Sequence, residues 1–206
     1  MEVHDAVRAL RDTPRWAFAA TDADLKFPRA ATVFACALGA PITEASMPNL
    51  YVLLQRTMVD AGQSTYAAKE KYRRPRPFAQ LDEPLCVPED VELLRRNGSY
   101  PSGHAAAGWA WALILAEIAP ERTDALLQRG REFGQSRAIC NVHWQSDVDT
   151  AQTIAAAVVA RLHGNAEFRA QLERARKEVD RARRSAATAG VDCEAESRAL
   201  EIYTAP

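Results

Sequence analysis

The apolar stretch at residues 105–119, AAAGWAWALILAEIA, constrains the fold more than any other part of the sequence. It contains one charged residue, Glu117, and it follows Ser102, whose side chain favours the N-cap position of a helix. The stretch therefore predicts a helix that begins at Gly103. It is shorter than the roughly 20 apolar residues that cross a bilayer, and so is the other long apolar stretch, residues 31–42. We therefore expect no membrane span.

Apolar residues recur at helical spacing along much of the remaining chain, while runs of β-branched residues are few. This pattern predicts an all-α fold, a single compact helical bundle domain. Residues 75–88 contain four prolines and residues 97–101 contain Pro101, and we expect both segments to be loops. The expected helices cover residues 3–11, 28–38, 47–60, 64–71, 89–96, 103–118, 122–138, 143–163 and 166–187.

The carboxyl-terminal part, residues 166–206, begins with a segment that is rich in opposite charges four residues apart and poor in apolar residues. We expect a solvated helix and a tail that belong to the same domain as residues 1–165. Beyond Gly190 the sequence carries no structural signal unless Cys193 ties the tail down.

Composition restricts the classes of function. The 206 residues are 48% hydrophobic with a net charge of -1, a balance typical of a soluble globular protein. Such a charge argues against a general affinity for nucleic-acid polymers or anionic membranes, so any basic binding site must be local. The amino terminus has Glu2 and Asp5 where a signal peptide carries positive charge, and we expect no export signal in this chain.

The cysteines leave two interpretations open. They are widely spaced and include no CxxC pair. They can form two structural disulfides in an oxidising compartment, or they can be buried free thiols. The four residues concerned are Cys36, Cys86, Cys140 and Cys193.

The first of three informative blocks is KEKYRRPRP, residues 69–77. Pro77 disfavours helix at Arg76, so the block predicts a helix that ends in an extended turn, which can aim the guanidinium inward. The planar fork of Arg76 donates two parallel hydrogen bonds and Lys69 supplies a point charge, so the pair suits a tetrahedral phosphate dianion. The alternative is a solvated basic run.

The second block, GSYPSGH at residues 98–104, precedes the predicted apolar helix. The free amides of a first helical turn and the helix dipole attract an anion, and Gly103 lets the backbone approach it closely. His104 on that turn would face the same anion and could give a proton to a departing oxygen. The alternative is that the block is only a loop with Ser102 as a cap.

The third block, SRAICNVHWQSD at residues 136–147, contains Arg137 and places His143 four residues before Asp147. On a helix these two side chains share a face, so the carboxylate can fix one tautomer of the imidazole and prepare a nucleophilic nitrogen. A surface His/Asp pair is one alternative. A metal site that includes Cys140 is another, but the spacing does not support a closed zinc site.

Together the blocks read Lys-x6-Arg-Pro, Pro-Ser-Gly-His and Ser-Arg-x5-His-x3-Asp. This pattern resembles the signature of the type 2 phosphatidic acid phosphatase and vanadium haloperoxidase superfamily. The longer forms GSYPSGHA and SRAICNVHWQSD resemble its soluble branch, the bacterial class A nonspecific acid phosphatases. The motifs cover residues 69–147, with weaker similarity upstream, and Ala105 stands where many relatives have Thr.

The resemblance implies an acid phosphatase, a metal-independent phosphomonoester hydrolase of broad specificity with its site between residues 69 and 147. His143 would attack phosphorus and form a phosphohistidine, Asp147 would orient it, and His104 would protonate the leaving alcohol. The residues implied in phosphate binding are Lys69, Arg76, Ser102, Gly103 and Arg137.

The resemblance also implies no cofactor, inhibition by vanadate, small phosphomonoesters as partners, a periplasmic or secreted location, a possible homo-oligomer and possible phosphotransfer to alcohols. An acidic optimum is expected if His104 must be protonated while His143 is neutral. The alternative function is a vanadate-dependent haloperoxidase that holds vanadate in the same cage. Aromatic side chains that could wall a leaving group, or only pack at the rim, are Tyr72, Tyr100 and Trp144.

Overall fold

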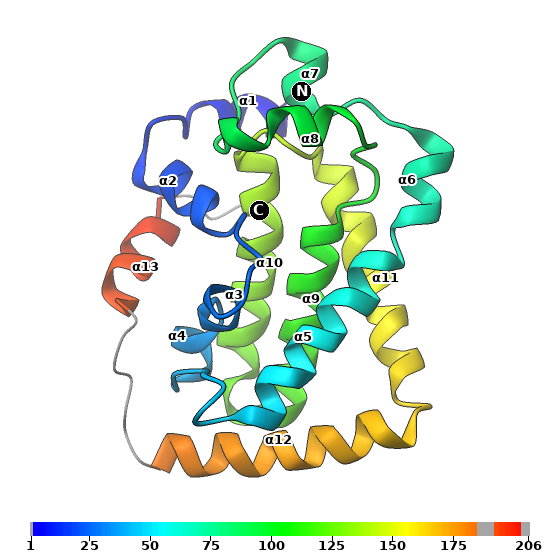
Figure 1. Cartoon of the computed structure of the whole chain (residues 1–206). Helices are drawn as coiled ribbons and strands as arrows, with labels where there is room; N and C mark the ends of the chain where they lie inside the picture. The colour runs from blue at the N-terminus through cyan, green and yellow to red at the C-terminus, as the bar shows by residue number, and fades with distance from the viewer. Residues whose placement is uncertain (1, 185–191, 203–206) are drawn as a thin grey trace.

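The computed structural model describes residues 2–184 and 192–202, and all regular structure in these residues is helical (Figure 1). This confirms the predicted all-α fold. None of the described helices combines the length and the apolar character that a membrane span requires. The elements are α1 (Glu2–Arg8), α2 (Pro14–Thr21), α3 (Arg29–Thr32), α4 (Ala35–Leu38), α5 (Pro48–Gln63), α6 (Tyr66–Tyr72), α7 (Pro77–Leu81), η1 (Pro88–Asp90), α8 (Val91–Arg95), α9 (Gly103–Ile118), η2 (Pro120–Arg122), α10 (Thr123–Ile139), α11 (Gln145–Leu162), α12 (Ala166–Arg184) and α13 (Cys193–Leu200).

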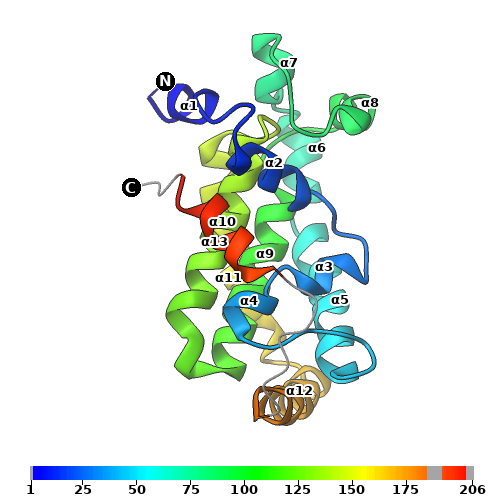
Figure 2. The same ribbon diagram turned by 90° about the vertical axis from the view of Figure 1, so that its left-hand side faces the viewer.

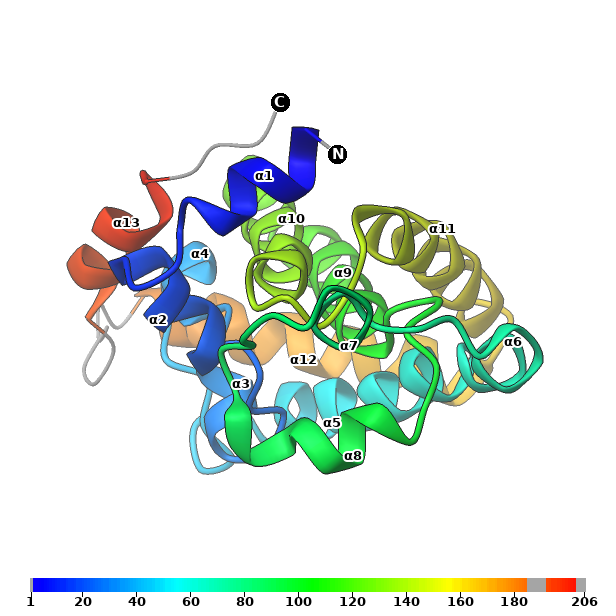
Figure 3. The same ribbon diagram turned by 90° about the horizontal axis from the view of Figure 1, so that it is seen from above.

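Helix α9 lies in the middle of the bundle, with α5, α10 and α11 packed around it (Figure 3). Its bounds are those predicted, and its apolar character on all sides suits a fully surrounded helix, as the buried Trp111 shows. Gly108 in α9 and Gly130 in α10 allow these two helices to approach closely, because a Cβ on either residue would overlap side chains of the facing helix.

The chain direction brings the three sequence blocks to one end of the bundle. Helix α10 runs antiparallel to α9 and α11, so the start of α9, the end of α10 and the start of α11 lie at the same end (Figure 1). The loop that follows α6 crosses this end. Residues far apart in the sequence therefore meet there.

Helix α12 lies across the opposite end of the bundle and packs on α5 (Figure 1). The expected solvated helix is instead amphipathic, because Phe168, Leu172 and Val179 are buried in the main hydrophobic core. Its Glu178 carboxylate accepts the backbone amides of Asn49 and Leu50, both at 3.0 Å, in the first turn of α5. A negative charge stabilises a helix at this end.

Several expected boundaries were wrong. The expected helix at residues 28–38 is divided into α3 and α4, and the break at residues 33–34 includes the second of two adjacent β-branched residues, Thr32 and Val33. Helix α2 was not predicted, although Thr13 caps it, and α7 lies within the expected loop at residues 75–88. Both begin with proline, which fits the first helical turn. Helix α11 starts at Gln145 rather than at His143. The expected end of the 166–187 helix lies outside the described residues.

The cysteines form two disulfides, so the interpretation of free thiols was wrong. Cys36 bonds Cys193 and thereby joins α4 to the start of α13, which packs against α2 (Figure 2). Cys86 bonds Cys140 and joins the loop after α7 to the end of α10. Cys140 lies three residues before His143, so this disulfide restrains the segment that carries the histidine.

Candidate active site

The structure places six of the eight predicted site residues around one cavity of about 290 Å³. Ser102 and Asp147 are fully buried and do not line it. They lie behind the lining residues, where the Ser102 amide donates to the Asp147 carbonyl at 3.0 Å and so connects the start of α9 to α11. The six lining residues are Lys69, Arg76, Gly103, His104, Arg137 and His143.

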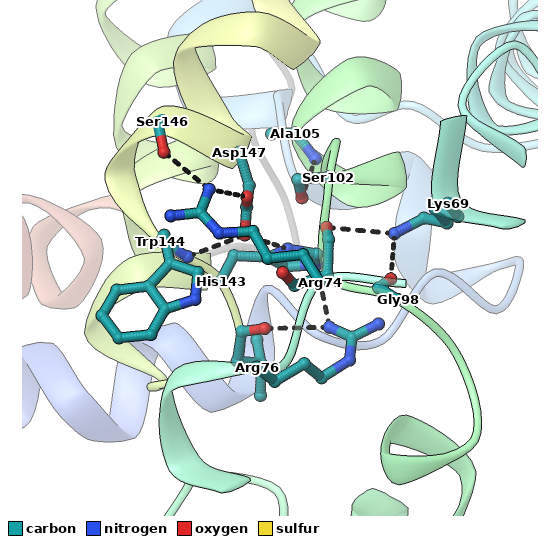
Figure 4. Close-up of polar contacts among 12 residues, drawn as sticks. Lys69, Arg74, Arg76, Gly98, Ser102, Ala105, His143, Trp144, Ser146 and Asp147 are labelled. Atoms are coloured by element: carbon teal, nitrogen blue, oxygen red, sulfur yellow. Dashed lines mark hydrogen bonds and ion pairs between the residues drawn. The ribbon is translucent and has the colours of Figure 1, made fainter. Parts of the chain in front are cut away.

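Two neighbours determine the tautomer of His143 (Figure 4). Its Nδ1 lies 3.3 Å from Oδ2 of Asp147, and its Nε2 lies 3.1 Å from Nη1 of Arg76. A carboxylate only accepts and a guanidinium only donates, so Nδ1 carries the hydrogen and Nε2 keeps its lone pair. Burial, followed by the charges of Arg76 and Lys69, holds the pKa of His143 well below its usual value. The result is a neutral imidazole whose Nε2 lone pair accepts a hydrogen from Arg76.

The sequence predicted that His143 and Asp147 meet on one face of a helix. The structure shows the contact but not the shared helix. Helix α11 begins at Gln145, so His143 precedes it while Asp147 lies in its first turn. Oδ2 of Asp147 accepts the backbone amide of Trp144 at 2.9 Å and caps the helix with the same oxygen that faces His143. Burial raises the pKa of Asp147, while hydrogen bonds from Trp144 and Arg74 lower it.

We call Lys69, Arg76 and Arg137 the basic cage. The first two are held by backbone carbonyls: Lys69 donates to the carbonyl of Gly98 at 2.9 Å, and Arg76 to that of Val142 at 2.9 Å. Arg76 has the extended backbone predicted for a residue before proline. Burial, and then the neighbouring Arg76, lower the pKa of Lys69 to about 7. Burial also lowers the pKa of Arg76 to about 10.

Arg137 is the least satisfied member of the cage. It is 2% exposed, and its Nε and Nη1 atoms have no hydrogen-bond partner among the described residues. Burial, and then the charge of Arg76, lower its pKa to about 10. Buried donors normally find acceptors, and an anion in the cavity that Arg137 lines would supply them.

A buried polar network behind Arg137 was not predicted. The Ser136 hydroxyl donates to Asp22 at 2.6 Å, and Arg15 donates to that hydroxyl at 3.0 Å. Arg129 forms a buried ion pair with Asp22. The serine of the Ser-Arg motif thus helps to join α2 to α10 directly behind Arg137.

His104 contacts the backbone rather than a carboxylate. Its Nε2 lies 3.0 Å from the carbonyl oxygen of Ala23, which can only accept, so Nε2 carries a hydrogen and Nδ1 is the exchangeable nitrogen. Burial and the charge of Arg137 lower the pKa of His104 to about 3. With this pKa His104 is neutral at ordinary pH.

Ser102 has the predicted capping role. Its hydroxyl oxygen accepts the amide of Ala105 at 3.2 Å (Figure 4), and α9 begins at Gly103, the residue after Ser102. The first amides of a helix lack intrahelical acceptors. Gly103, which lines the cavity, presents this end of α9 to whatever the cavity holds.

Arg74 belongs to the first block, but the sequence analysis assigned it no role. Its Nη1 donates to Oδ1 of Asp147 at 2.7 Å and to the hydroxyl of Ser146 at 2.8 Å. Its guanidinium also lies 5.4 Å from the ring centroid of Trp144. Because Arg73 and Arg74 are adjacent and identical, no sequence pattern separates them.

The aromatic residues suggested as a substrate wall lie elsewhere. Trp144 donates its indole hydrogen to the Pro75 carbonyl at 2.9 Å, and Tyr72 packs edge-on against Tyr100 at 5.5 Å. None of the three lines the cavity. Its apolar wall is formed instead by Leu25, Met58, Tyr66, Leu93, Leu94 and Ala107.

No group of three or more His, Cys, Asp or Glu side chains in the described part of the chain is arranged to hold a metal ion. The metal alternative for the third block also loses one of its ligand types, because the Cys140 sulfur is bonded to Cys86.

Comparison with known proteins places the chain. The family model of the PAP2 superfamily matches residues 49–169. A non-specific acid phosphatase of Providencia stuartii is 50% identical over 177 residues, covering 85% of this chain and 71% of that protein. An acid phosphatase of Zymomonas mobilis is 42% identical, covering 91% and 73%, and a non-specific acid phosphatase of Salmonella typhimurium is 43% identical, covering 84% and 69%. The chain therefore belongs to the PAP2 superfamily, among its class A nonspecific acid phosphatases.

Proposed function

We propose that this protein is an acid phosphatase that hydrolyses phosphomonoesters without a metal ion, through a phosphohistidine. One observation carries the proposal: Arg137, whose buried Nε and Nη1 have no hydrogen-bond partner among the described residues, lines the same cavity as the neutral imidazole of His143. A phosphoryl group would satisfy these donors and would lie beside a nucleophile. The acid phosphatases with 42–50% identity support it.

In the proposed first step, the basic cage and the first amides of α9 hold the phosphoryl oxygens. Nε2 of His143 forms a bond to phosphorus while the bond from phosphorus to the ester oxygen breaks. His104, protonated once the dianion is bound, gives a proton from Nδ1 to the departing oxygen. Asp147 stabilises the positive charge that develops on His143. Fixed charges and dipoles stabilise the transition state.

In the second step, water attacks phosphorus and the bond to His143 breaks. Neutral His104 accepts a proton of this water at Nδ1 and becomes the protonated form that the next leaving group requires. An alcohol that enters instead of water would receive the phosphoryl group, which makes phosphotransfer the corresponding side reaction.

The cavity supports broad specificity. Every charged group that lines it belongs to the cage or is a histidine of the reaction, while the remaining wall is largely apolar. Side chains such as Leu25, Met58 and Tyr66 contact a leaving group without selecting one pattern of hydrogen bonds. We expect aryl, nucleoside and sugar phosphates to be accepted.

The two disulfides support a location in an oxidising compartment, the periplasm or the exterior. This would be tested by fractionating cells of the source organism and by titrating thiols in the recovered protein. Free thiols on all four cysteines would contradict it.

The decisive experiment for the activity is an assay in excess chelator against a panel of phosphomonoesters, with vanadate as an inhibitor. We expect retained hydrolysis, inhibition by vanadate, and an acid-quenched phosphoenzyme that His143→Ala lacks. Activity that disappears in chelator and returns with a divalent metal would overturn the metal-free mechanism.

A further inference from the structure

Two adjacent arginines at the end of α6 lie in different environments. The Arg73 side chain is 80% exposed and pairs with Glu70 at 3.3 Å, one helical turn earlier. The Arg74 side chain is 36% exposed and pairs at 2.7 Å with Asp147, whose side chain is not exposed at all. The second contact is between segments 73 positions apart, so it depends on the tertiary fold.

Arg74 is one of several partners of Asp147, which also receives a side-chain hydrogen bond from Ser99. Oδ2 receives the amide of Trp144 and faces Nδ1 of His143, while Oδ1 receives the guanidinium of Arg74. With both oxygens engaged, the carboxylate cannot rotate without breaking a charge-assisted hydrogen bond. Figure 4 shows Arg74 reaching across to this carboxylate and to Ser146.

The backbone of this segment is also fixed. The carbonyl of Arg74 accepts the amide of Ser99 at 2.9 Å, and the carbonyl of Pro75 accepts the indole of Trp144 at 2.9 Å. The guanidinium of Arg74 lies over the ring of Trp144. The loop after α6 therefore contacts the start of α11 at Trp144, Ser146 and Asp147, in the segment that directly follows His143.

We propose that Arg74 is a positioning residue that fixes the Asp147 carboxylate and, through it, the orientation and tautomer of His143. The proposal rests on the proposed role of His143 as nucleophile. Burial raises the pKa of Asp147, and Arg74 is among the groups that lower it, so the contact also favours the ionised carboxylate. Arg74 does not line the cavity, so its removal should affect the chemical step more than substrate affinity.

The kinetic test compares Arg74→Met and Arg74→Lys with Arg73→Met as the matched control. We expect Arg74→Met to lower kcat by about ten- to a hundredfold, the range for a misplaced reacting group, and to change KM much less than kcat. Arg74→Lys should recover part of kcat, since it keeps the charge without the fork. Arg73→Met should leave both constants unchanged. Wild-type kcat in Arg74→Met would overturn the proposal.

A second measurement does not depend on turnover. Nitrogen-15 NMR distinguishes the two neutral tautomers of histidine, and the His143 signals are assigned by their loss in His143→Gln. We expect the form with hydrogen on Nδ1 in the wild type and a mixture in Arg74→Met. An unchanged tautomer would count against Arg74, whereas an inactive wild type with the expected tautomers would count only against the proposed function.

If Arg74→Met does not fold, Ser146→Ala replaces it, because it removes the other acceptor of the same guanidinium nitrogen. Ser146 is exposed, so the variant should fold. We expect its kcat to fall by about two- to tenfold, the effect of one hydrogen bond, and Arg74→Lys to fall further. Wild-type kcat in both variants would overturn the proposal.

Discussion

The Nη1 atom of Arg76 lies 3.1 Å from Nε2 of His143, so a residue of the basic cage covers the nitrogen that would attack phosphorus. Its donated hydrogen keeps the lone pair of Nε2 directed into the cage. In the proposed mechanism a phosphoryl oxygen would take this donor, which would uncover Nε2 when an electrophile is bound. The residue that orders His143 is thus the one proposed to bind the substrate.

Replacing Arg137 by Met should stabilise the empty protein and abolish phosphate binding. In the wild type, burying this cation with Nε and Nη1 unpartnered among the described residues costs about 1–3 kcal/mol of folding free energy. The substitution removes this cost. We expect the free energy of unfolding without ligand to rise, and the increase in Tm that inorganic phosphate causes in the wild type to disappear.

Arg137→Lys serves as the control, because it keeps the charge without the planar fork. It should retain a smaller phosphate-induced shift in Tm. If the ligand-free Arg137→Met protein unfolds more easily than the wild type, the guanidinium stabilises the fold itself, and its unpaired donors are no evidence for an anion site.

The alkaline limb of activity should depend on Lys69. Its pKa is lowered to about 7, so the ammonium is charged below pH 7 and loses its proton as the pH rises through this value. We expect kcat/KM, which reports ionisations of the free enzyme, to fall above about pH 7. Lys69→Arg keeps its charge and should move the fall to higher pH for the same substrate. Superimposed alkaline limbs in the two proteins would contradict this assignment.

Local patterns were sufficient to predict much of this site. Ser102 as the cap of α9 and Arg76 as an extended residue before Pro77 follow from nearest neighbours, and both agree with the structure. The proximity of His143 and Asp147 was predicted for the wrong reason. Their contact is made by a capping carboxylate at the start of α11 and not along its face.

The supporting residues could not be predicted because their contacts are not local. Arg74 meets Asp147 across 73 positions, and Arg15 meets Ser136 across 121. Nothing in the spacing of these residues indicates such pairs, since they depend on how α2, α10 and α11 pack. The short helices α2 and α7 were missed because one or two turns carry too little periodicity to distinguish them from a loop.

The role of His104 as a general acid predicts a dependence on the leaving group. His104→Gln can keep a donor near the Ala23 carbonyl, while both His104→Gln and His104→Asn lack a titrating nitrogen. We expect both to lower kcat by about 10²- to 10⁴-fold for alkyl phosphates, and much less for p-nitrophenyl phosphate, whose leaving group needs no proton. Of the two, His104→Gln should keep the Tm closer to that of the wild type. Equal losses for both substrates would exclude this role.

Two glycines of the second block should respond differently to alanine. A Cβ at Gly98 would lie 2.8 Å from the Lys69 carbonyl oxygen and 3.1 Å from Cα of Arg73, so the backbone must move, at a cost of about 1–3 kcal/mol. A Cβ at Gly103 would lie at ordinary contact distances, 3.5 Å from the Thr65 hydroxyl and 4.0 Å from the Gly62 carbonyl oxygen, but Gly103 lines the cavity. We therefore expect Gly98→Ala to lower the Tm and Gly103→Ala to keep it while weakening vanadate binding, measured as the inhibition constant. Wild-type vanadate inhibition in a stable Gly103→Ala protein would show that the anion does not approach this part of α9.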